Sequence, residues 1–376
     1  MKYYFIAGEA SGDLHAGNCM RELKKLDAHA DFAFTGGDVM EEVSGKKADI
    51  HIKNMNFMGF VDVLKNIGTI RKNFKKVKED ILANAPDLLV LVDYPGFNLR
   101  MAKWAHQHGI KVDYYISPTV WAWKEGRVET LRKYTHKMFV ILPFEEPWYL
   151  KKRNMKVHFV GHPLVDAIEM KRPLLKSKEQ FVKDNQLSEK PIIAVLPGSR
   201  VQEIERMLQL MMDVMPKFKE YQFVVAGSNT LDKKYFEPLY RNNIKVVFNQ
   251  TYELMRYAEA GIIKSGTSTL ESALWELPQV ICYKGGALSF CIAKMLVDTK
   301  YIGLPNLIMD APLVKELVQD YLTTENITKE LEQLLHNSEY RESMINNYRK
   351  LKQHLGGTGA SARLAAELYK DVKEES

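Results

Sequence analysis

The chain has 376 residues, of which 46 % are hydrophobic and 27 % charged, and its net charge at pH 7 is +6. This length predicts two domains, and this composition excludes a collagen-like, coiled-coil or wholly disordered chain. The longest run without a charged residue, 221–231, is too short for a transmembrane helix, which needs about 20 apolar residues. The apolar stretch 3–6 is too short for a secretory signal, and the three cysteines form no CxxC pair. We therefore expect a soluble, cytoplasmic protein without a disulfide framework or a zinc site.

Short apolar runs alternate with helix-patterned segments along almost the whole chain. Predicted strands lie at residues 3–7, 88–92, 112–116, 137–142 and 158–161, and then at 192–196, 222–226, 245–248, 260–264 and 279–283. Helical spacing marks residues 67–81, 203–215, 270–277 and 360–372. This alternation predicts an α/β fold with parallel sheets that are covered by helices on both faces.

The segment 170–191 interrupts the alternation, because it contains Arg172-Pro173 and several lysines but no strand signal. We predict that it connects two doubly wound domains, an N-terminal one at residues 1–170 and a C-terminal one at 171–345. A C-terminal helix within residues 346–376 is expected to pack back on the first domain. Open parallel sheets bind ligands at the carboxyl ends of their strands, so the loops that follow the strands are the candidate sites.

Two polar loops follow strands of the predicted N-terminal domain. The first runs from Gly8 to Asp13 and contains Glu9 and Ser11. It either offers backbone N–H groups to an anion or a sugar hydroxyl, or is a turn capped by Ser11 or Asp13. The second loop begins with Asp93, directly after an apolar strand. Burial there would raise the pKa of the carboxyl group and suit it to general-base catalysis, whereas the alternative is an Asp that caps the next helix.

Two aromatic segments of the same domain are also candidates for ligand contact. Trp121 and Trp123 either line a sugar or acyl-chain pocket or pack against the domain core. A second apolar patch precedes the basic helix at 67–81 and consists of Phe57, Met58, Phe60 and Val61. An apolar patch beside a cationic helix is typical of contact with a membrane surface, and burial of the patch in the core is the alternative.

The predicted C-terminal domain contains two loops that suit an anion. Gly198, Ser199 and Arg200 follow one strand and open a helix. Ser265, Gly266, Thr267, Ser268 and Thr269 follow another, and Glu271 comes one turn into the next helix. Two such loops in one domain favour a nucleoside diphosphate over ordinary helix capping, with Glu271 placed to reach ribose hydroxyls. The chain has neither a GxGxxG fingerprint nor a P-loop sequence.

The polar and aromatic loops at residues 8–13, 93–98, 117–123, 196–200 and 265–271, together with residues 58–64, 159–163 and 304–307, form a series of motifs. This series resembles that of lipid-A-disaccharide synthases, in the same order and over roughly residues 3 to 310. The resemblance implies a GT-B glycosyltransferase with two Rossmann-like domains. It implies an inverting reaction of UDP-2,3-diacylglucosamine with 2,3-diacylglucosamine 1-phosphate that forms the β-1,6-linked disaccharide 1-phosphate and UDP. It further implies a metal-independent enzyme without a cofactor, bound peripherally at the cytoplasmic face of the inner membrane.

The resemblance also implies roles for individual residues. Asp93 is the general base, while Glu9 and Ser11 position a sugar. The residues expected to hold the UDP group are Gly198, Ser199, Arg200, the helix start 265–269, Glu271 and Asn306. A homodimer with exchanged C-terminal segments is allowed. The chain departs from the family at Gly96, where some relatives carry Asp, and at Lys264, which would pair with a phosphate or face outward.

Two other functions stay open at this point. One is another enzyme of the UDP-N-acetylglucosamine type on the same scaffold, either an epimerase or a lipid-linked sugar transferase. The other is a non-catalytic, membrane-surface protein that binds a nucleotide. The loops at 8–13 and 117–123 favour a transferase over an epimerase, because they are acceptor-side features. Nucleic-acid binding is not expected, since no basic stripe is interleaved with aromatic residues. His15, His136 and His162 have no ligand partner at a spacing that suits a metal.

Overall fold

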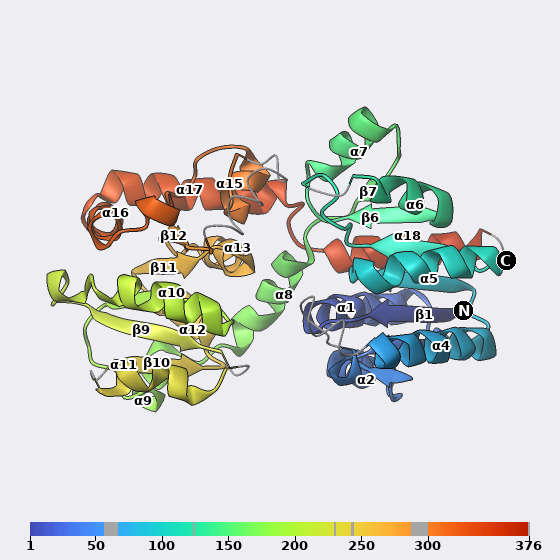
Figure 1. Ribbon diagram of the computed structural model, residues 1–376, viewed down its shortest axis with the longest axis horizontal. Coiled ribbons are helices and arrows are strands. Elements are labelled where there is room, and N and C mark those ends of the chain that lie inside the picture. Colours follow the sequence, from blue (N-terminus) through green and yellow to red (C-terminus); the bar gives the residue numbers. More distant parts are fainter. Residues whose placement is uncertain (56–66, 123–124, 229–230, 242–243, 287–299, 375–376) are drawn as a thin grey trace. The chain divides into compact units, whose positions relative to one another are not determined.

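The computed structural model describes residues 1–55, 67–122, 125–228, 231–241, 244–286 and 300–374. The chain forms two compact units (Figure 1). Unit 1 comprises Met1–Asp166 and Leu355–Ser376, and unit 2 comprises Ala167–His354. The first unit thus ends at Asp166, four residues before the predicted boundary at residue 170. The chain returns to unit 1 at Leu355, within the predicted segment 346–376.

The described part of unit 1 contains a seven-stranded parallel sheet in the order β3-β2-β1-β4-β5-β6-β7. Its strands are β1 (Lys2–Ala7), β2 (Asp31–Gly36), β3 (Ile50–His51), β4 (Leu88–Val92), β5 (Val112–Tyr115), β6 (Lys137–Val140) and β7 (His158–Phe159). The strand order reverses between β1 and β4, where Ala7 pairs with Val92. The loops after these two strands therefore begin next to each other, at the point where doubly wound sheets bind ligands.

The central strand β1 divides the core of unit 1 into two faces. Tyr4 and Ile6 are fully buried on the face that is covered by helices α4 (Ile67–Asn84) and α5 (Pro95–Gln107). Tyr3 and Phe5 point to the opposite face, which is covered by α1 (Ala10–Leu26) and the returning helix α18 (Ala360–Lys373). Successive side chains of a strand alternate between faces, so a continuous apolar run is what a sheet covered on both sides requires.

The described part of unit 2 contains a six-stranded parallel sheet in the order β10-β9-β8-β11-β12-β13. Its strands are β8 (Ile192–Leu196), β9 (Gln222–Gly227), β10 (Lys245–Phe248), β11 (Ala260–Lys264), β12 (Gln279–Tyr283) and β13 (Glu316–Val318). The order reverses between β8 and β11, where Leu196 pairs with Ile263. This unit has its own switch point, at which α10 (Val201–Met212) and α13 (Thr267–Leu274) begin.

The remaining helices connect the strands or cover the sheets (Figure 1). In unit 1 these are α2 (Asp38–Ser44), α6 (Arg127–Tyr134) and α7 (Glu145–Arg153), and α8 (Pro163–Lys171) leads into unit 2. In unit 2 they are α9 (Lys178–Asp184), α11 (Glu237–Arg241), α12 (Thr251–Tyr257), α15 (Leu304–Met309), α16 (Thr324–His336) and α17 (Ser338–His354). Within the described ranges, no helix combines the length and the apolar character needed to cross a membrane. Cys19 and Cys282 are free and buried, and Cys291 lies outside the described residues.

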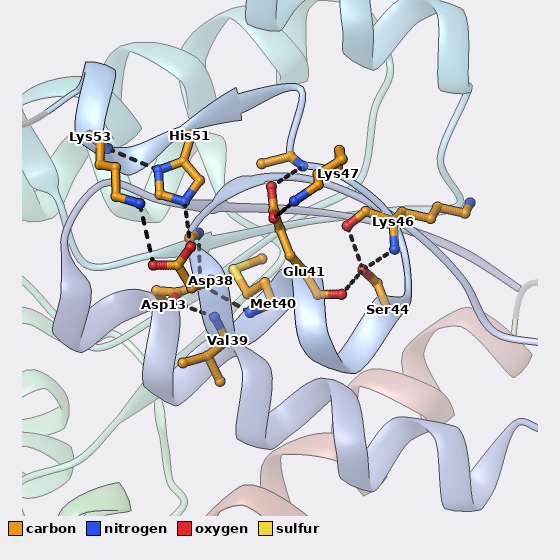
Figure 2. Close-up of polar contacts among 12 residues, drawn as sticks. Asp13, Asp38, Val39, Met40, Glu41, Ser44, Lys46, Lys47, His51 and Lys53 are labelled. Carbon is orange, nitrogen blue, oxygen red and sulfur yellow. Dashed lines mark hydrogen bonds and ion pairs between the residues drawn. The ribbon is translucent and has the colours of Figure 1, made fainter.

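The carboxylate of Asp13 ties α1 to the start of α2 (Figure 2). Asp13 is only 3 % exposed, and it accepts hydrogen bonds from the backbone N–H groups of Gly37 (2.7 Å), Val39 (3.0 Å) and Met40 (3.2 Å). These groups have no partner within α2, and a negative charge near them also interacts favourably with the helix dipole. Asp13 therefore has a structural role in the first polar loop.

We predict that Asp13→Ala lowers the free energy of unfolding by about 3 kcal/mol, because buried N–H groups lose a charged acceptor. Urea unfolding would measure this change. Asp38→Ala is the matched control, because the Asp38 side chain is 76 % exposed and only pairs with His51 and Lys53 at the surface. It should have little effect. Equal effects of the two substitutions would contradict the role given to Asp13.

Candidate functional site

The loop after β4 places Asp93 at the switch point of unit 1 in a strained conformation. Asp93 and Tyr94 both have positive φ angles, 46° and 45°, which residues other than glycine rarely adopt. Hydrogen bonds hold this conformation. The Asp93 carbonyl accepts from the Asn98 amide (2.8 Å) and the Tyr114 hydroxyl (2.6 Å), and its N–H donates to the Tyr115 carbonyl (2.9 Å). The backbone of Asp93 is thus secured by its neighbours.

The loop after β1 approaches Asp93 closely. A Cβ atom at Gly8 would lie 2.4 Å from the ring of Tyr94, so this approach requires glycine. Burial raises the pKa of Asp93 to about 6, and the nearby negative charge of Glu9 contributes to the rise. Ser11 is exposed in the first turn of α1. The structure therefore brings Asp93 and Glu9 together, as adjacent strand ends should.

A cavity of about 490 Å³ lies at the switch point of unit 2, at the carboxyl ends of β8, β9 and β11. Residues of four loops line it: Leu196, Gly198, Ser199, Arg200, Glu203, Ala226, Gly227, Ser228, Thr251, Lys264, Gly266, Thr267, Ser268 and Glu271. The sequence analysis singled out the loops after β8 and β11. Gly227, Ser228 and Thr251 were not predicted. The available signals were the end of the predicted strand at 222–226 for Gly227 and Ser228, and the end of the strand at 245–248 for Thr251.

In the loop after β8, backbone N–H groups bind a carboxylate of the helix that follows, Glu203 of α10. Glu203 accepts hydrogen bonds from the N–H groups of Ser199 (3.0 Å) and Arg200 (3.3 Å). Its other oxygen pairs with the ammonium of Lys264 at 2.7 Å. Gly198 has a φ of 109°, and a Cβ atom there would lie 2.2 Å from Glu203. These N–H groups are thus taken by Glu203. Lys264 lines the cavity and pairs with Glu203, so it does not face outward.

Two side chains at the edge of this cavity suit a nucleotide. The guanidinium of Arg200 is exposed and has no ion-pair partner among the described residues, so its charge is available to an anion. Glu271 accepts a hydrogen bond from the hydroxyl of Tyr252 at 2.8 Å, and burial raises its pKa. A half-buried carboxylate beside a hydroxyl can accept hydrogen bonds from ribose.

The loop after β11 contributes fewer side chains than the sequence suggested. Gly266, Thr267 and Ser268 line the cavity at the start of α13. Ser265 and Thr269 are 8 % and 0 % exposed, and their hydroxyls donate to backbone carbonyls at 2.9 and 2.8 Å. The expectation that every residue from 265 to 269 faces a ligand therefore fails for these two hydroxyl groups.

Asn306 does not border the cavity, and both ends of its amide are engaged elsewhere. Its NH₂ group donates to the Val314 carbonyl and to Glu316, both at 2.8 Å, and its oxygen accepts from the N–H of Val314 at 2.9 Å. Asn306 is 1 % exposed. It fastens α15 to the segment before β13, and we therefore do not retain its assignment to the pyrophosphate.

Of the aromatic and apolar candidates, only Trp121 lies among the described residues. The half-buried Trp121 packs edge to face on Phe144, with ring centroids 4.9 Å apart, so it has a role in packing. Nearby, Glu145 is 2 % exposed, and burial raises its pKa to about 7. The remaining candidates of this kind lie outside the described residues: Phe57, Met58, Phe60, Val61 and Trp123.

One group of potential metal ligands occurs among the described residues. Oxygen or nitrogen atoms of Asp113, His136 and Asp371 lie within 4.8 Å of one another. The group is at the amino ends of β5 and β6, at the sheet edge opposite to Asp93, and Lys137 also pairs with Asp371. His136 had no such neighbours in the sequence pattern, because Asp113 reaches it through the pairing of β5 with β6 and Asp371 through the return of α18. The contacts hold α18 on unit 1.

Each unit is thus a doubly wound parallel sheet with polar groups gathered at its switch point, and two such units define the GT-B class of fold. Comparison with solved structures supports this class of fold. The chain is similar to UDP-GlcNAc 2-epimerase from Neisseria meningitidis bound to UDP-GlcNAc, with a TM-score of 0.70, 16 % identity, and coverage of 98 % of this chain and 100 % of that one. The epimerase of Methanocaldococcus jannaschii in complex with UDP-GlcNAc and UDP gives a TM-score of 0.61 at 14 % identity, over 94 % and 100 % of the chains. At such identities the likeness shows the fold alone.

Sequence comparison identifies the family. The model of the lipid-A-disaccharide synthetase family matches residues 3–368. A lipid-A-disaccharide synthase of Coxiella burnetii is 37 % identical over 97 % of this chain and 96 % of its own length. The corresponding enzyme of Trichlorobacter lovleyi is 36 % identical over 98 % and 97 %. The chain therefore belongs to the lipid-A-disaccharide synthase family, whose members are glycosyltransferases of lipid A biosynthesis. This match over the whole chain decides against the epimerase alternative.

Proposed function

We propose that this protein condenses UDP-2,3-diacylglucosamine with 2,3-diacylglucosamine 1-phosphate, forming the β-1,6-linked disaccharide 1-phosphate and UDP. The observation that carries this proposal is the carboxyl group of Asp93, which is half-buried at the switch point of unit 1 and whose pKa is raised to about 6. A base with this pKa is ionised at neutral pH and still basic enough to accept a proton from a hydroxyl group as that group attacks. Membership of the family supports the choice of substrates.

In the proposed reaction the 6-hydroxyl oxygen of the acceptor attacks the anomeric carbon of the donor. The bond from that carbon to the phosphate oxygen breaks, UDP leaves with the bonding electrons, and the configuration inverts. Asp93 accepts the hydroxyl proton. Burial, together with the charge of Glu9, keeps the pKa of Asp93 high, and Ser11, exposed on the neighbouring helix, is placed to orient a sugar.

We assign the donor nucleotide to the cavity of unit 2. Arg200 and the free N–H groups at the start of α13 offset the negative charge that develops on the departing diphosphate. Glu271 binds ribose hydroxyls, together with Tyr252. Both carboxylates that line the cavity already have partners, Glu203 in Lys264 and Glu271 in Tyr252. Because these carboxylates are engaged by protein groups, they support a metal-independent reaction in which cationic and N–H groups take the place of a metal ion.

We further propose that the enzyme acts as a peripheral protein at the cytoplasmic face of the inner membrane. Helix α4 supports this, because Arg71, Lys72, Lys75 and Lys76 are all exposed on it, and anionic head groups attract such a surface. A homodimer with exchanged C-terminal segments would replace the contact of α18 with its own unit 1 by the same contact between two copies.

A glycosyl-transfer assay in EDTA tests the proposed function. We expect wild-type protein to form the tetra-acyl disaccharide, and Asp93→Asn to lower turnover by roughly 10²–10⁴-fold while UDP binding is unchanged. The exposed carboxylate variant Asp38→Asn serves as the control and should stay active. Release of UDP without disaccharide would indicate a different acceptor, and loss of UDP binding in Asp93→Asn would contradict the role of Asp93.

The pH dependence gives a second prediction. Asp93 must be ionised to accept a proton, so kcat/KM should fall as the pH falls through about 6. Glu9→Gln removes a negative charge that raises the pKa of Asp93, so it should move the midpoint of this fall to lower pH. Ser11→Ala changes no charge and should leave the midpoint in place. An unmoved or higher midpoint in Glu9→Gln would refute the coupling between the two carboxyl groups.

Binding of UDP tests the assignment of unit 2. Arg200→Ala should weaken UDP binding about tenfold or more, since a charge-assisted hydrogen bond to the diphosphate is lost. Arg206→Ala is the matched control, because Arg206 is exposed on the same helix, α10, but does not line the cavity. Isothermal titration calorimetry would measure both. If the two variants bind UDP equally well, Arg200 does not hold the diphosphate.

A further inference from the structure

A second cavity, of about 350 Å³, lies within unit 1 beside the Asp93 loop. Its apolar walls are formed by Ile70 and Phe74 of α4 and by Tyr94 and Phe97 at the start of α5. Phe74 meets Phe97 edge to face, with centroids 5.1 Å apart. Pockets for small ligands are mostly apolar and begin at about 300 Å³, so this cavity is large enough to hold part of a ligand.

Two arginines border the same cavity. Arg71 of α4 and Arg100 of α5 are both exposed, and neither has an ion-pair partner among the described residues. An apolar cavity with two guanidinium groups at its edge complements a molecule that combines a hydrocarbon chain with a phosphate. Neither feature is explained by the nucleotide site, which lies in unit 2.

We propose that this cavity binds one acyl chain of the monosaccharide 1-phosphate acceptor, and that Arg71 and Arg100 bind the phosphate of the same molecule. The proposal rests on the proposed function. The acceptor is chosen over the donor because Tyr94 and Gly96, which line the cavity, follow Asp93 directly in the chain. A molecule held here by its chain and its phosphate has its sugar near the base that deprotonates it.

Gly96 provides a direct way to fill the cavity. A Cβ atom at Gly96 would meet no atom within 4 Å, so a larger side chain is accommodated at the expense of cavity space. We expect Gly96→Leu to raise KM about tenfold for an acceptor with long acyl chains, because a few methylene groups lose their burial. KM for an acceptor with short acyl chains and the affinity for UDP should stay the same.

Gly68→Leu is the matched control. Gly68 is the second residue of α4, as Gly96 is the second residue of α5, and a Cβ atom at Gly68 also meets nothing within 4 Å. Gly68 does not line the cavity. Its substitution should therefore leave KM unchanged for both acceptors.

The arginines are tested with an acceptor that lacks the phosphate. Arg71→Ala and Arg100→Ala should each raise KM about tenfold for the phosphorylated acceptor, through loss of a charge-assisted hydrogen bond. They should leave KM for the phosphate-free acceptor unchanged. Lysine at either position keeps the charge and should restore part of the affinity.

The assays are run in mixed micelles of a neutral detergent, with vesicle association measured separately. Absence of disaccharide with wild-type protein would refute the proposed function and this inference with it. If wild-type protein is active, equal KM values of Gly96→Leu and wild type for the long-chain acceptor would overturn the cavity assignment alone. Weakened vesicle association of Gly96→Leu without any dependence of KM on chain length would also overturn it, and would assign the cavity to a membrane phospholipid.

Discussion

The proposed chemistry depends on one carboxylate, Asp93, that is half withdrawn from water and has no cationic partner among the residues that the structure describes. Burial and the charge of Glu9 raise the pKa of Asp93, so the folded state binds a proton at this group more readily than the unfolded chain does. Folding is therefore opposed by this group once the pH rises above the pKa of an unfolded Asp, and this destabilisation is largest above about pH 6. The two buried faces of the sheet and the hydrogen bonds of Asn98 and Tyr114 hold the loop in place despite this cost.

The two units use the same topology for opposite electrostatic purposes. In unit 1 the switch point gathers Asp93 and Glu9, which is a negative environment suited to accepting a proton. In unit 2 the Glu203 carboxylate accepts hydrogen bonds from the N–H groups of the loop after β8 and forms an ion pair with Lys264. Among the described residues that line the cavity, Arg200 and the start of α13 are the positive groups assigned to the proposed diphosphate. An internal carboxylate thus shapes the loop, and in the proposed function the diphosphate is bound by the neighbouring groups.

The sequence predicted those parts of the fold that local apolar pattern determines, and missed those that depend on distant partners. Ten strands follow from continuous apolar runs, but β2, β3 and β13 do not: β3 has two residues, and β13 has one buried residue, Leu317, next to Glu316. Asp93 could be found because it directly follows an apolar strand. The hydrogen bonds of Asn306 could not be predicted, because its partners lie in and just before β13, the strand that the pattern did not reveal. The inward turn of the Ser265 and Thr269 hydroxyls depends on the loop after β11 and on how α13 is rotated against the sheet, which spacing does not specify.

Helix α4 shows why one periodic stripe can serve both packing and binding. Val77 and Ile81 are fully buried against the sheet, whereas Ile70 and Phe74, earlier on the same helix, are only half-buried and wall the cavity beside Asp93. The apolar stripe therefore continues beyond the core and ends where a hydrocarbon chain could complete it. Arg71 adds charge to this same end of the helix. A substrate with a chain, a phosphate and a reactive hydroxyl matches these three features together, whereas a membrane lipid without that hydroxyl would leave the adjacent base without a role.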